Sequence, residues 1–390
     1  MARLGDVCII NPKGKSLDDD CDVSFVPMQS VSEDGTVDVT TIRKYGEVKK
    51  GFTNFQDGDI LFAKITPCME NGKGCIANGL KNGMGFGSTE FHVLRPKSEL
   101  VTSEWIYYLT SWPEFRKECE KNMTGSAGQK RVPKTFLENY QIDIPSLDEQ
   151  DRITAQLDKV SDLIAKREAQ LNKLDLLVKA RFVEMFGDPA GNPMKWEETT
   201  IGRECYYIKD GPHKSLKDVG KGNGYPFISV RNIVNGSIDF STAKYISEQD
   251  YFESIKKCNP QKGDMLYSKG GTTGIAKLID VDTKFANWVH VAVLKFDDSL
   301  DGIFFENMLN SEYCYTQSQR LTKGVANRDL VLSAMAKIQL YKPPVDLQKK
   351  FACFARKIEK TKLNVRQSLE ELEILKKALI QEYFWMSFYI

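Results

Sequence analysis

The feature that most restricts the fold of this chain is an internal duplication. YQIDIPSLDEQ at residues 140–150 aligns with IQLYKPPVDLQ at residues 338–348, an offset of 198 residues (338 minus 140). KARFVEMF at 179–186 aligns with KALIQEYF at 377–384 at the same offset. GDILFAK and GDMLYSK, which start at Gly58 and Gly263, are 205 residues apart (263 minus 58). The frame of the repeat therefore keeps its register while the interior varies, as expected for one scaffold that presents two different surfaces.

Two stretches of the chain carry short runs typical of β-strands, separated by turn residues. In residues 1–146 these runs are VSFVPM, GDILFAK and EFHVLRP; in residues 188–344, which begin with a linker, they are YPFISV, GDMLYSK and HVAVLKF. Short helical patterns also occur, such as SEWIYYLTSWPEFRKECE at 103–120. We therefore expect an α+β fold with two mixed α/β domains, each built on a small, antiparallel-rich sheet.

Each domain is followed by a segment that predicts a long helix, at residues 147–187 and, together with a C-terminal tail, at 345–390. Residues 148–186 contain no Gly or Pro, and IPSLDEQ is a helix start signal. Ten positions spaced alternately four and three residues apart form a heptad seam, which recurs 198 residues later. A single such helix could be an ordinary core helix, but two at matching repeat positions favour mutual pairing. The apolar seam residues are Ile153, Leu157, Val160, Ile164, Leu171, Leu174 and Val178, and then Phe351, Ile358, Val365, Leu369, Leu372 and Leu379.

The direct repeat predicts a particular geometry if the two seams pack together. The first helix carries the chain away from the first domain, so the second must run back beside it. The expected product is an antiparallel coiled coil roughly 50 Å long with one domain at each end, related by a pseudo-two-fold axis. Two-fold readers of duplex DNA contact half-sites about 34–36 Å apart, or a multiple of this. Two unlike domains on such a bar suit a bipartite, asymmetric DNA site.

Bulk composition is compatible with this interpretation but does not decide it. The net charge is +1, so a nucleic-acid surface would need its basic residues gathered on one face. Nine cysteines without a Cys-x-x-Cys pair argue against a disulfide framework and a structural zinc site, and we expect a cytoplasmic protein. The N-terminal residues lack the apolar core of a signal peptide, and no stretch approaches the roughly 18 apolar residues of a membrane span.

Over essentially its whole length the chain resembles the specificity subunits of type I restriction–modification enzymes. The matching stretches are LGDVC, FVPMQSVSEDG, GDILFAKITPCMENGKG, TGSAGQKRVP, IDIPSLDEQDRI, EMFGDPAGNPMKWE, YPFISVRNIVNG and GDMLYSKGGTTGIAK. The resemblance implies that residues 1–146 and 188–344 hold target recognition domains, and that the helices are spacers that dock two methyltransferase (modification) subunits. Restriction/translocase subunits would bind through these. The chain itself would be non-catalytic and without a cofactor.

One segment departs from the family pattern. The chain ends on an apolar aromatic cluster, EYFWMSFYI at residues 382–390. We leave open whether this cluster packs near the N-terminus or against a partner.

Candidate DNA-contacting residues follow from the chemistry of base edges and phosphates. Arg and Lys suit guanine, Asn and Gln suit adenine, Thr methyls suit thymine, and phosphates accept from cationic and hydroxyl groups. In the first domain the candidates are Lys64, Thr66, Asn71, Lys73, Ser88, Thr89, Ser126, Gln129, Lys130 and Arg131. In the second they are Arg231, Asn232, Lys269, Thr272, Thr273, Lys277, Asn327 and Arg328. The alternative for each loop is a solvated turn without a ligand. Because similar loops recur in both repeats, we favour DNA contact. His92 and His290 lie in β-type runs and are expected to be structural.

Two other functions are compatible with parts of this sequence. The main alternative is a protein–protein scaffold that holds two domains apart by a coiled coil and binds no DNA. The second is a self-contained methyltransferase or nuclease. Against it, the chain has no Asn/Asp-Pro-Pro-aromatic tetrapeptide, no Gly-rich cofactor loop between a strand and a helix, no P-loop and no recognisable metal-ligand spacing.

Overall fold

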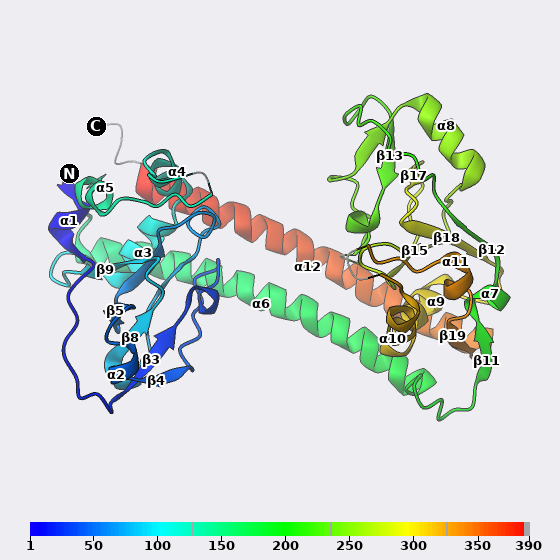
Figure 1. The fold of residues 1–390 in the computed structure, drawn as a ribbon, viewed down its shortest axis with the longest axis horizontal. Coiled ribbons are helices and arrows are strands. Elements are labelled where there is room, and N and C mark those ends of the chain that lie inside the picture. The colour runs from blue at the N-terminus through cyan, green and yellow to red at the C-terminus, as the bar shows by residue number, and fades with distance from the viewer. Residues whose placement is uncertain (127, 235, 325–326, 386–390) are drawn as a thin grey trace. The chain divides into compact units, whose positions relative to one another are not determined.

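The computed structural model describes residues 1–126, 128–234, 236–324 and 327–385. The chain divides into two compact units, Met1–Glu168 with Gln367–Ile390, and Ala169–Arg366 (Figure 1). This division differs from the four segments expected from the sequence. Each globular part shares its core with the start of one long helix and the end of the other, so each long helix is divided between the units.

The described residues of the first unit form two four-stranded sheets and one short end pair. The sheet orders are β2-β9-β6-β7 and β4-β3-β8-β5, and β1 pairs with β10. All neighbours are antiparallel except β3 and β8, a parallel pair that the sequence did not predict. The strands are β1 Ala2–Arg3, β2 Cys8–Ile10, β3 Asp22–Val26, β4 Ile42–Lys44, β5 Thr53–Gln56, β6 Ile60–Ala63, β7 Gly74–Ile76, β8 Met84–Gly87, β9 Phe91–Pro96 and β10 Gln141–Ile142.

Helices cover the first of these sheets and build the main core of the unit. The helical pattern at 103–120 forms two helices rather than one, because Trp112 is extended and Pro113 starts a new helix. Phe62 of β6 meets Phe115 of α4 edge to face at 5.8 Å within this core. The helices are α1 Leu4–Val7, α2 Tyr45–Val48, α3 Ser103–Ser111, α4 Pro113–Lys121 and α5 Lys134–Asn139, with 3-10 turns at Met28–Ser30 and Lys81–Gly83.

Within its described residues, the second unit repeats this plan with one change. Its first sheet has the equivalent order β12-β18-β15-β16, and β11 pairs with β19, but its second sheet has only three strands, β14-β13-β17. Again one pair, β13 with β17, is parallel. Its elements are β11 Glu197–Thr200, α7 Ile201–Glu204, β12 Cys205–Asp210, β13 Tyr225–Ile228, a 3-10 turn Val230–Asn232, β14 Lys244–Ile246, α8 Glu248–Lys257, β15 Met265–Ser268, β16 Ala276–Leu278, β17 Ala286–Asn287, β18 Val291–Phe296, α9 Gly302–Leu309, α10 Glu312–Leu321, α11 Leu332–Met335 and β19 Gln339–Lys342.

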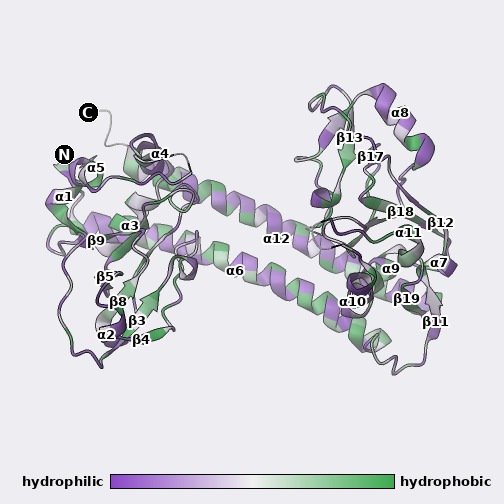
Figure 2. Ribbon diagram, viewed as in Figure 1, coloured by the Kyte–Doolittle hydropathy of each residue, from purple (hydrophilic) through white to green (hydrophobic). Residues whose placement is uncertain are grey.

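The two long helices are α6, Leu147–Phe186, and α12, Val345–Trp385. Neither contains Gly or Pro, so nothing in their sequences interrupts the backbone hydrogen bonds. Every predicted seam position is buried or half-buried, including the polar members Arg167, Arg181, Lys362 and Lys376. Hydrophobic and hydrophilic bands alternate along both helices in Figure 2, as a one-sided apolar stripe requires.

An aromatic side chain from the last turn of one long helix anchors each unit. In the first unit Phe384 of α12 packs against Trp105 of α3, with ring centroids 5.5 Å apart. In the second unit Phe186 of α6 packs against Phe304 of α9 at 4.8 Å and against Phe351 at 5.6 Å. Phe186 and Phe384 are 198 residues apart (384 minus 186). Residues 386–390 of the apolar C-terminal cluster lie outside the described residues, whereas Tyr383 and Phe384 belong to the core of the first unit.

A buried glutamine fastens the start of the other long helix in each unit. Gln150 of α6 accepts from the backbone N–H of Thr102 at 2.9 Å and donates to the carbonyls of Leu100 at 3.0 Å and Pro145 at 2.9 Å.

Gln348 of α12 does the same 198 residues later. It accepts from the N–H of Asp301 at 2.9 Å and donates to the carbonyl of Pro343 at 2.7 Å. Both amide groups are fully buried. Each glutamine satisfies backbone groups of the loop ahead of a short helix, α3 in the first unit and α9 in the second. These hydrogen bonds join the sheet domain to the long helix.

We expect Gln150→Leu to lower the free energy of unfolding of the first unit by roughly 1–3 kcal/mol for each buried backbone group left without a partner. Hydrogen exchange measured by mass spectrometry should show faster exchange at residues 97–106 and at the start of α6. Gln348→Leu is the matched control, and it should affect residues 297–305 instead. Equal loss of protection in both units from either variant would contradict the assignment.

Candidate nucleic-acid interface

In the first unit two distant segments of the candidate site meet in a small β-bridge. Ile65 and Thr124 both pair with Arg131, and the backbone N–H of Thr66 donates to the carbonyl of Lys130 at 3.1 Å. The N–H of Lys130 returns a bond to the Thr66 hydroxyl at 3.2 Å. We call residues 124–126 and 128–131, the described part of this segment, the first hairpin. Its tip carries the exposed side chains of Ser126, Gln129 and Lys130, whereas Lys64 and Thr66 at its base are half-buried.

Arg131 is held by a carboxylate that the sequence analysis did not single out. Its guanidinium makes a two-point contact with Glu90, with Nε–Oε2 at 2.9 Å and NH2–Oε1 at 2.8 Å. The hydrogen bond from Arg131 holds the pKa of the Glu90 carboxyl below its usual range. Glu90 also brings the turn with half-buried Ser88 and exposed Thr89 next to the hairpin. Arg131 therefore positions the hairpin while keeping 41% of its side-chain surface exposed.

His92 locks the far end of the hairpin, in agreement with its expected structural role. Its Nε2 lies 2.8 Å from the carbonyl of Val132, and its Nδ1 lies 3.0 Å from Nδ2 of Asn11. A neutral ring that donates from Nε2 and accepts at Nδ1 satisfies both contacts. Burial lowers the pKa of His92 below its ordinary value.

Two candidates of the first unit lie away from the hairpin. The Lys73 ammonium donates to the backbone carbonyl of Met28 at 3.2 Å, so it fixes the 28–30 turn. Asn71 is exposed but lines a separate cavity of about 530 Å³ with Tyr107, Arg116 and Lys376. The structure therefore does not bring Asn71 and Lys73 together with the hairpin.

The second unit builds an equivalent hairpin, for which only residues 323–324 and 327–329 are described. Gly270 and Lys323 both pair with Asp329 in β-bridges. The N–H of Leu330 donates to the carbonyl of Lys269 at 2.7 Å, and the N–H of Gly271 donates to the carbonyl of Arg328 at 3.1 Å. Thr272, Asn327 and Arg328 are exposed there. Gln129 and Asn327, like Lys130 and Arg328, are 198 residues apart, so one frame presents different side chains.

Four candidates of the second unit are largely covered by the protein, and their polar groups are paired inside the domain. The Lys269 ammonium lies 2.9 Å from Asp329 and 3.5 Å from Asp210, with 7% of its side chain exposed. The Lys277 ammonium lies 3.0 Å from Glu306, whose pKa is raised by burial. These lysines neutralise the largely covered carboxylates of Asp210 and Glu306, where an unpaired charge would be costly.

The other two enclosed candidates are Asn232 and Thr273. The Asn232 amide donates to the carbonyl of Asp239 at 3.1 Å and accepts from the N–H of Ser229 at 2.9 Å, closing a turn. The hydroxyl of Thr273 pairs with that of Thr322 at 2.9 Å. Arg231 is exposed, but it donates to the Thr242 carbonyl at 2.7 Å.

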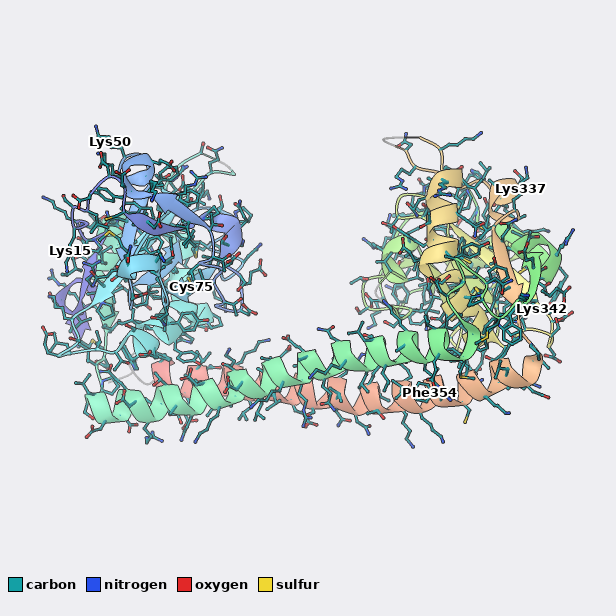
Figure 3. All side chains as sticks on the ribbon, turned by 90° about the horizontal axis from the view of Figure 1, so that it is seen from below. Lys15, Lys50, Cys75, Lys337, Lys342 and Phe354 are labelled. Carbon is teal, nitrogen blue, oxygen red and sulfur yellow. The ribbon has the colours of Figure 1, made fainter. Side chains whose placement is uncertain are left out.

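Partners of these side chains are what sequence reasoning missed. Glu90, Asp210 and Asp329 organise the cations of the two loops, and Gln319 contacts both Arg328 and the carbonyl of Thr273. The sequence did hold a signal for Asp329. It follows the candidate Arg131 by 198 residues and so occupies the equivalent position of the repeat. Other lysines of the first unit, such as Lys15 and Lys50, are exposed on its surface (Figure 3).

A family model for the type I restriction modification DNA specificity domain matches residues 1–175 and 193–374, which together make up most of the chain. The chain belongs to this family of specificity domains. The type I restriction enzyme EcoEI specificity subunit of Escherichia coli is 48% identical over 175 residues, which are 44% of this chain and 29% of that protein. The chain thus spans less than a third of that relative's length.

Solved structures share the fold of this specificity-domain protein. A chain from a study of complex assembly and conformational transition of the type I R-M system has a TM-score of 0.57 at 18% identity, covering 98% of this chain and 96% of that one. The S subunit of the type I restriction-modification system from M. genitalium has a TM-score of 0.56 at 14% identity, with coverage of 98% and 95%. At these identities the likeness concerns the fold alone, a mixed α/β architecture with two sheet-rich domains.

Among the described residues there is no group of three or more His, Cys, Asp or Glu side chains arranged to hold a metal ion. No helix in the part of the chain that the structure describes combines the length and apolarity of a bilayer span.

Acidification should loosen the first hairpin through His92. Because the folded pKa is depressed, the neutral ring contributes stability above the ordinary pKa of about 6.5, and this contribution is lost as the pH falls through the folded value. We expect the protection factors of residues 124–126 and 128–132, taken against the intrinsic amide exchange rate at each pH, to fall between pH 7.5 and pH 5 in the native chain. His92→Gln should flatten this dependence, whereas the exposed His213→Gln should keep it. An unchanged slope in His92→Gln would refute the mechanism.

Proposed function

We propose that this chain is the non-catalytic DNA-recognition subunit of a type I restriction–modification complex. Each sheet-rich domain reads one half of a bipartite, asymmetric duplex site, and the long helices dock two methyltransferase subunits, through which restriction/translocase subunits bind. The proposal places the complex in the cytoplasm, in keeping with the nine free cysteines. Family membership and the names of the relatives support it.

One observation carries the proposal most strongly. The same kind of β-bridge holds both hairpins. Their exposed tips differ, with Gln129 and Lys130 in the first unit and Asn327 and Arg328 in the second. An amide beside a cation can read adenine and guanine edges or a phosphate, and backbone bonds to the 64–66 and 269–271 segments limit the motion of each tip. A fixed frame with varied tips is what two unlike half-sites require.

The long helices supply the spacing in this proposal. In the first unit the start of α6 meets the end of α12, and in the second unit the end of α6 meets the start of α12. We infer from these two sets of contacts that the helices run antiparallel as a coiled coil. At about 1.5 Å per residue a 40-residue helix is roughly 60 Å long, which exceeds one turn of DNA. The target domains would then be related by a pseudo-two-fold axis.

Exposed apolar side chains on both helices support docking of two like partners. Leu176 and Leu177 of α6 are 63% and 46% exposed, and Ile374 and Leu375, which follow them by 198 residues, are 61% and 46% exposed. Apolar residues at matching repeat positions would otherwise face water. Two copies of one methyltransferase subunit can each use one of these pairs, because each pair lies in the same helical context.

The hairpin tips can be tested one half-site at a time. Gln129→Ala with Lys130→Ala should relax the base preference in one half of the consensus only, and Asn327→Ala with Arg328→Ala in the other only. Each lost base contact should weaken binding by about 1–3 kcal/mol. Selection from a random duplex library by the complex with methyltransferase subunits gives both consensus halves.

Lys134→Ala is the matched control, because Lys134 is an exposed lysine of α5 that pairs with Glu138 at 3.1 Å. It should leave both halves intact. A library that yields no two-part consensus at moderate salt would instead favour the scaffold alternative. Methyl transfer or cleavage by the purified chain alone would favour the enzyme alternative.

The spacing can be tested by shortening both helices equally. Deleting residues 166–172 and 364–370 removes one heptad from each helix and preserves the seam. The bar should shorten by about 10 Å, so the unread spacer should lose roughly three base pairs while each half-site stays the same. Methylated-site sequencing of a host that carries the variant measures both quantities. A change in either half-site would contradict the assignment of reading domains and spacer.

A further inference from the structure

The second unit departs from the repeat at one edge of its smaller sheet. In the first unit β4 is followed by the short helix α2 and by β5, which pairs with β8 and completes the sheet. In the second unit β14 is followed by the ten-residue helix α8, and the described residues supply no fourth strand. A helix cannot extend the hydrogen-bonded strand ladder beyond β17. Helix α8 and strand β17 therefore cannot pack as closely as two paired strands do.

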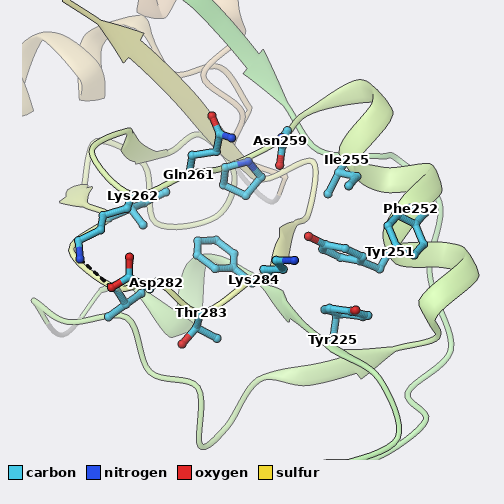
Figure 4. A pocket seen from close by; sticks show the side chains of 14 residues that line it. Tyr225, Tyr251, Phe252, Ile255, Asn259, Gln261, Lys262, Asp282, Thr283 and Lys284 are labelled. Carbon is cyan, nitrogen blue, oxygen red and sulfur yellow. Dashed lines mark hydrogen bonds and ion pairs between the residues drawn. The ribbon is translucent and has the colours of Figure 1, made fainter.

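A cavity of about 370 Å³ lies at this break (Figure 4). Its walls are α8, the 259–262 turn and residues 279–285, which lead into β17. The volume falls within the range of small-molecule sites in proteins, roughly 300–1,000 Å³. Neither the described residues of the second hairpin nor the Lys269 ion pairs line it. The cavity is therefore separate from the candidate DNA-reading surface.

One side of the cavity is aromatic and ordered before any ligand binds. Tyr225 and Tyr251 stack face to face, with ring centroids 3.9 Å apart and planes inclined by 11°. Phe252 meets Tyr251 edge to face at 5.4 Å and keeps 49% of its surface exposed, although it is a large apolar side chain. Such a set of rings favours a planar ligand, because a flat ring can contact them without reorganisation.

Cationic and hydroxyl donors also line the cavity. Lys284 is exposed and, within the described residues, has no ion pair or hydrogen bond, and its side chain lines the cavity (Figure 4). Lys262 contacts Asp282 at 2.7 Å, but both side chains are largely exposed, so this ion pair is weak and can exchange for another anion. Burial raises the pKa of Tyr251, so its phenol remains a hydrogen-bond donor at neutral pH.

We propose that this cavity binds a nucleotide, with the base against the Tyr225–Tyr251–Phe252 rings and the phosphate on Lys284 and Lys262. A planar ring joined to an anion matches both the rings and the donors of the cavity, whereas an apolar ligand would leave the donors unused. The nucleotide is either a free mononucleotide or one unpaired nucleotide of a single strand. The first unit has no such site among its described residues, because β5 occupies the corresponding place.

Binding is tested on the purified full chain by isothermal titration with AMP, CMP and a five-nucleotide single-stranded DNA. Saturable binding is expected, and Lys284→Ala should weaken it roughly tenfold or more through loss of a charge-assisted contact. Phe252→Ala should weaken it as well, and because Phe252 is exposed this variant should keep the native unfolding temperature. Lys256→Ala is the matched control, since Lys256 is an exposed lysine of α8 outside the cavity wall.

The outcomes separate the two sources of the ligand and the two proposals. Saturation by mononucleotides assigns the site to a free nucleotide, and saturation by the oligonucleotide alone assigns it to an unpaired strand. Failure of all three probes to bind, or equal binding by native chain, Lys284→Ala and Phe252→Ala, overturns the inference. Half-site selection by Lys284→Ala should be normal in either case, so the result is independent of the proposed duplex recognition.

Discussion

The structure depends on the way each sheet-rich unit grips the end of one long helix and the start of the other. In the first unit Phe384 closes the core around Trp105, while Gln150 holds the loop ahead of α3. In the second, Phe186 and Gln348 do the same with Phe304 and the loop ahead of α9. A fully buried phenylalanine is worth about 3–5 kcal/mol when truncated, so release of either helix end would cost its unit stability on that scale. The long helices are thus part of each domain's core.

This anchoring leaves the opposite ends of the sheets free to vary, and the charge pattern there follows a clear rule. Cations that hold the loops are paired internally: Arg131 with Glu90, Lys269 with Asp210 and Asp329, and Lys277 with Glu306. Cations at the tips, Lys130 and Arg328, are exposed. The small net charge of +1 therefore conceals a separation of roles, because these loop-holding cations are paired with carboxylates whereas the tip cations face solvent.

Much of the frame could be predicted from sequence, because repeat register and heptad spacing are local patterns. Both long helices, the strands at 60–63 and 265–268, and the burial of all twenty seam positions follow from them. The parallel pairing of β3 with β8 and of β13 with β17 could not be predicted, because it joins segments about 60 residues apart without a local signal. The enclosure of Lys269, Lys277, Asn232 and Thr273 could not be predicted either. A polar residue in a loop has the same local sequence whether its side chain faces solvent or a partner inside the domain.

Drift in the repeat register marks where the two units have diverged in structure. The offset stays at 198 residues from Tyr140 to Phe186, where the helix anchors lie, and at 205 between Gly58 and Gly263, after α8 has replaced α2 and β5. Constant offset thus coincides with shared cores. Part of the change in offset precedes α8, because β4 and β14 already start 202 residues apart (244 minus 42), and the rest follows it. A change of length inside a domain is tolerated only where it does not displace an anchor. The edge of the smaller sheet is such a place, because the apolar cluster around Phe227 of β13 and Ile246 of β14 includes no described residue of either long helix.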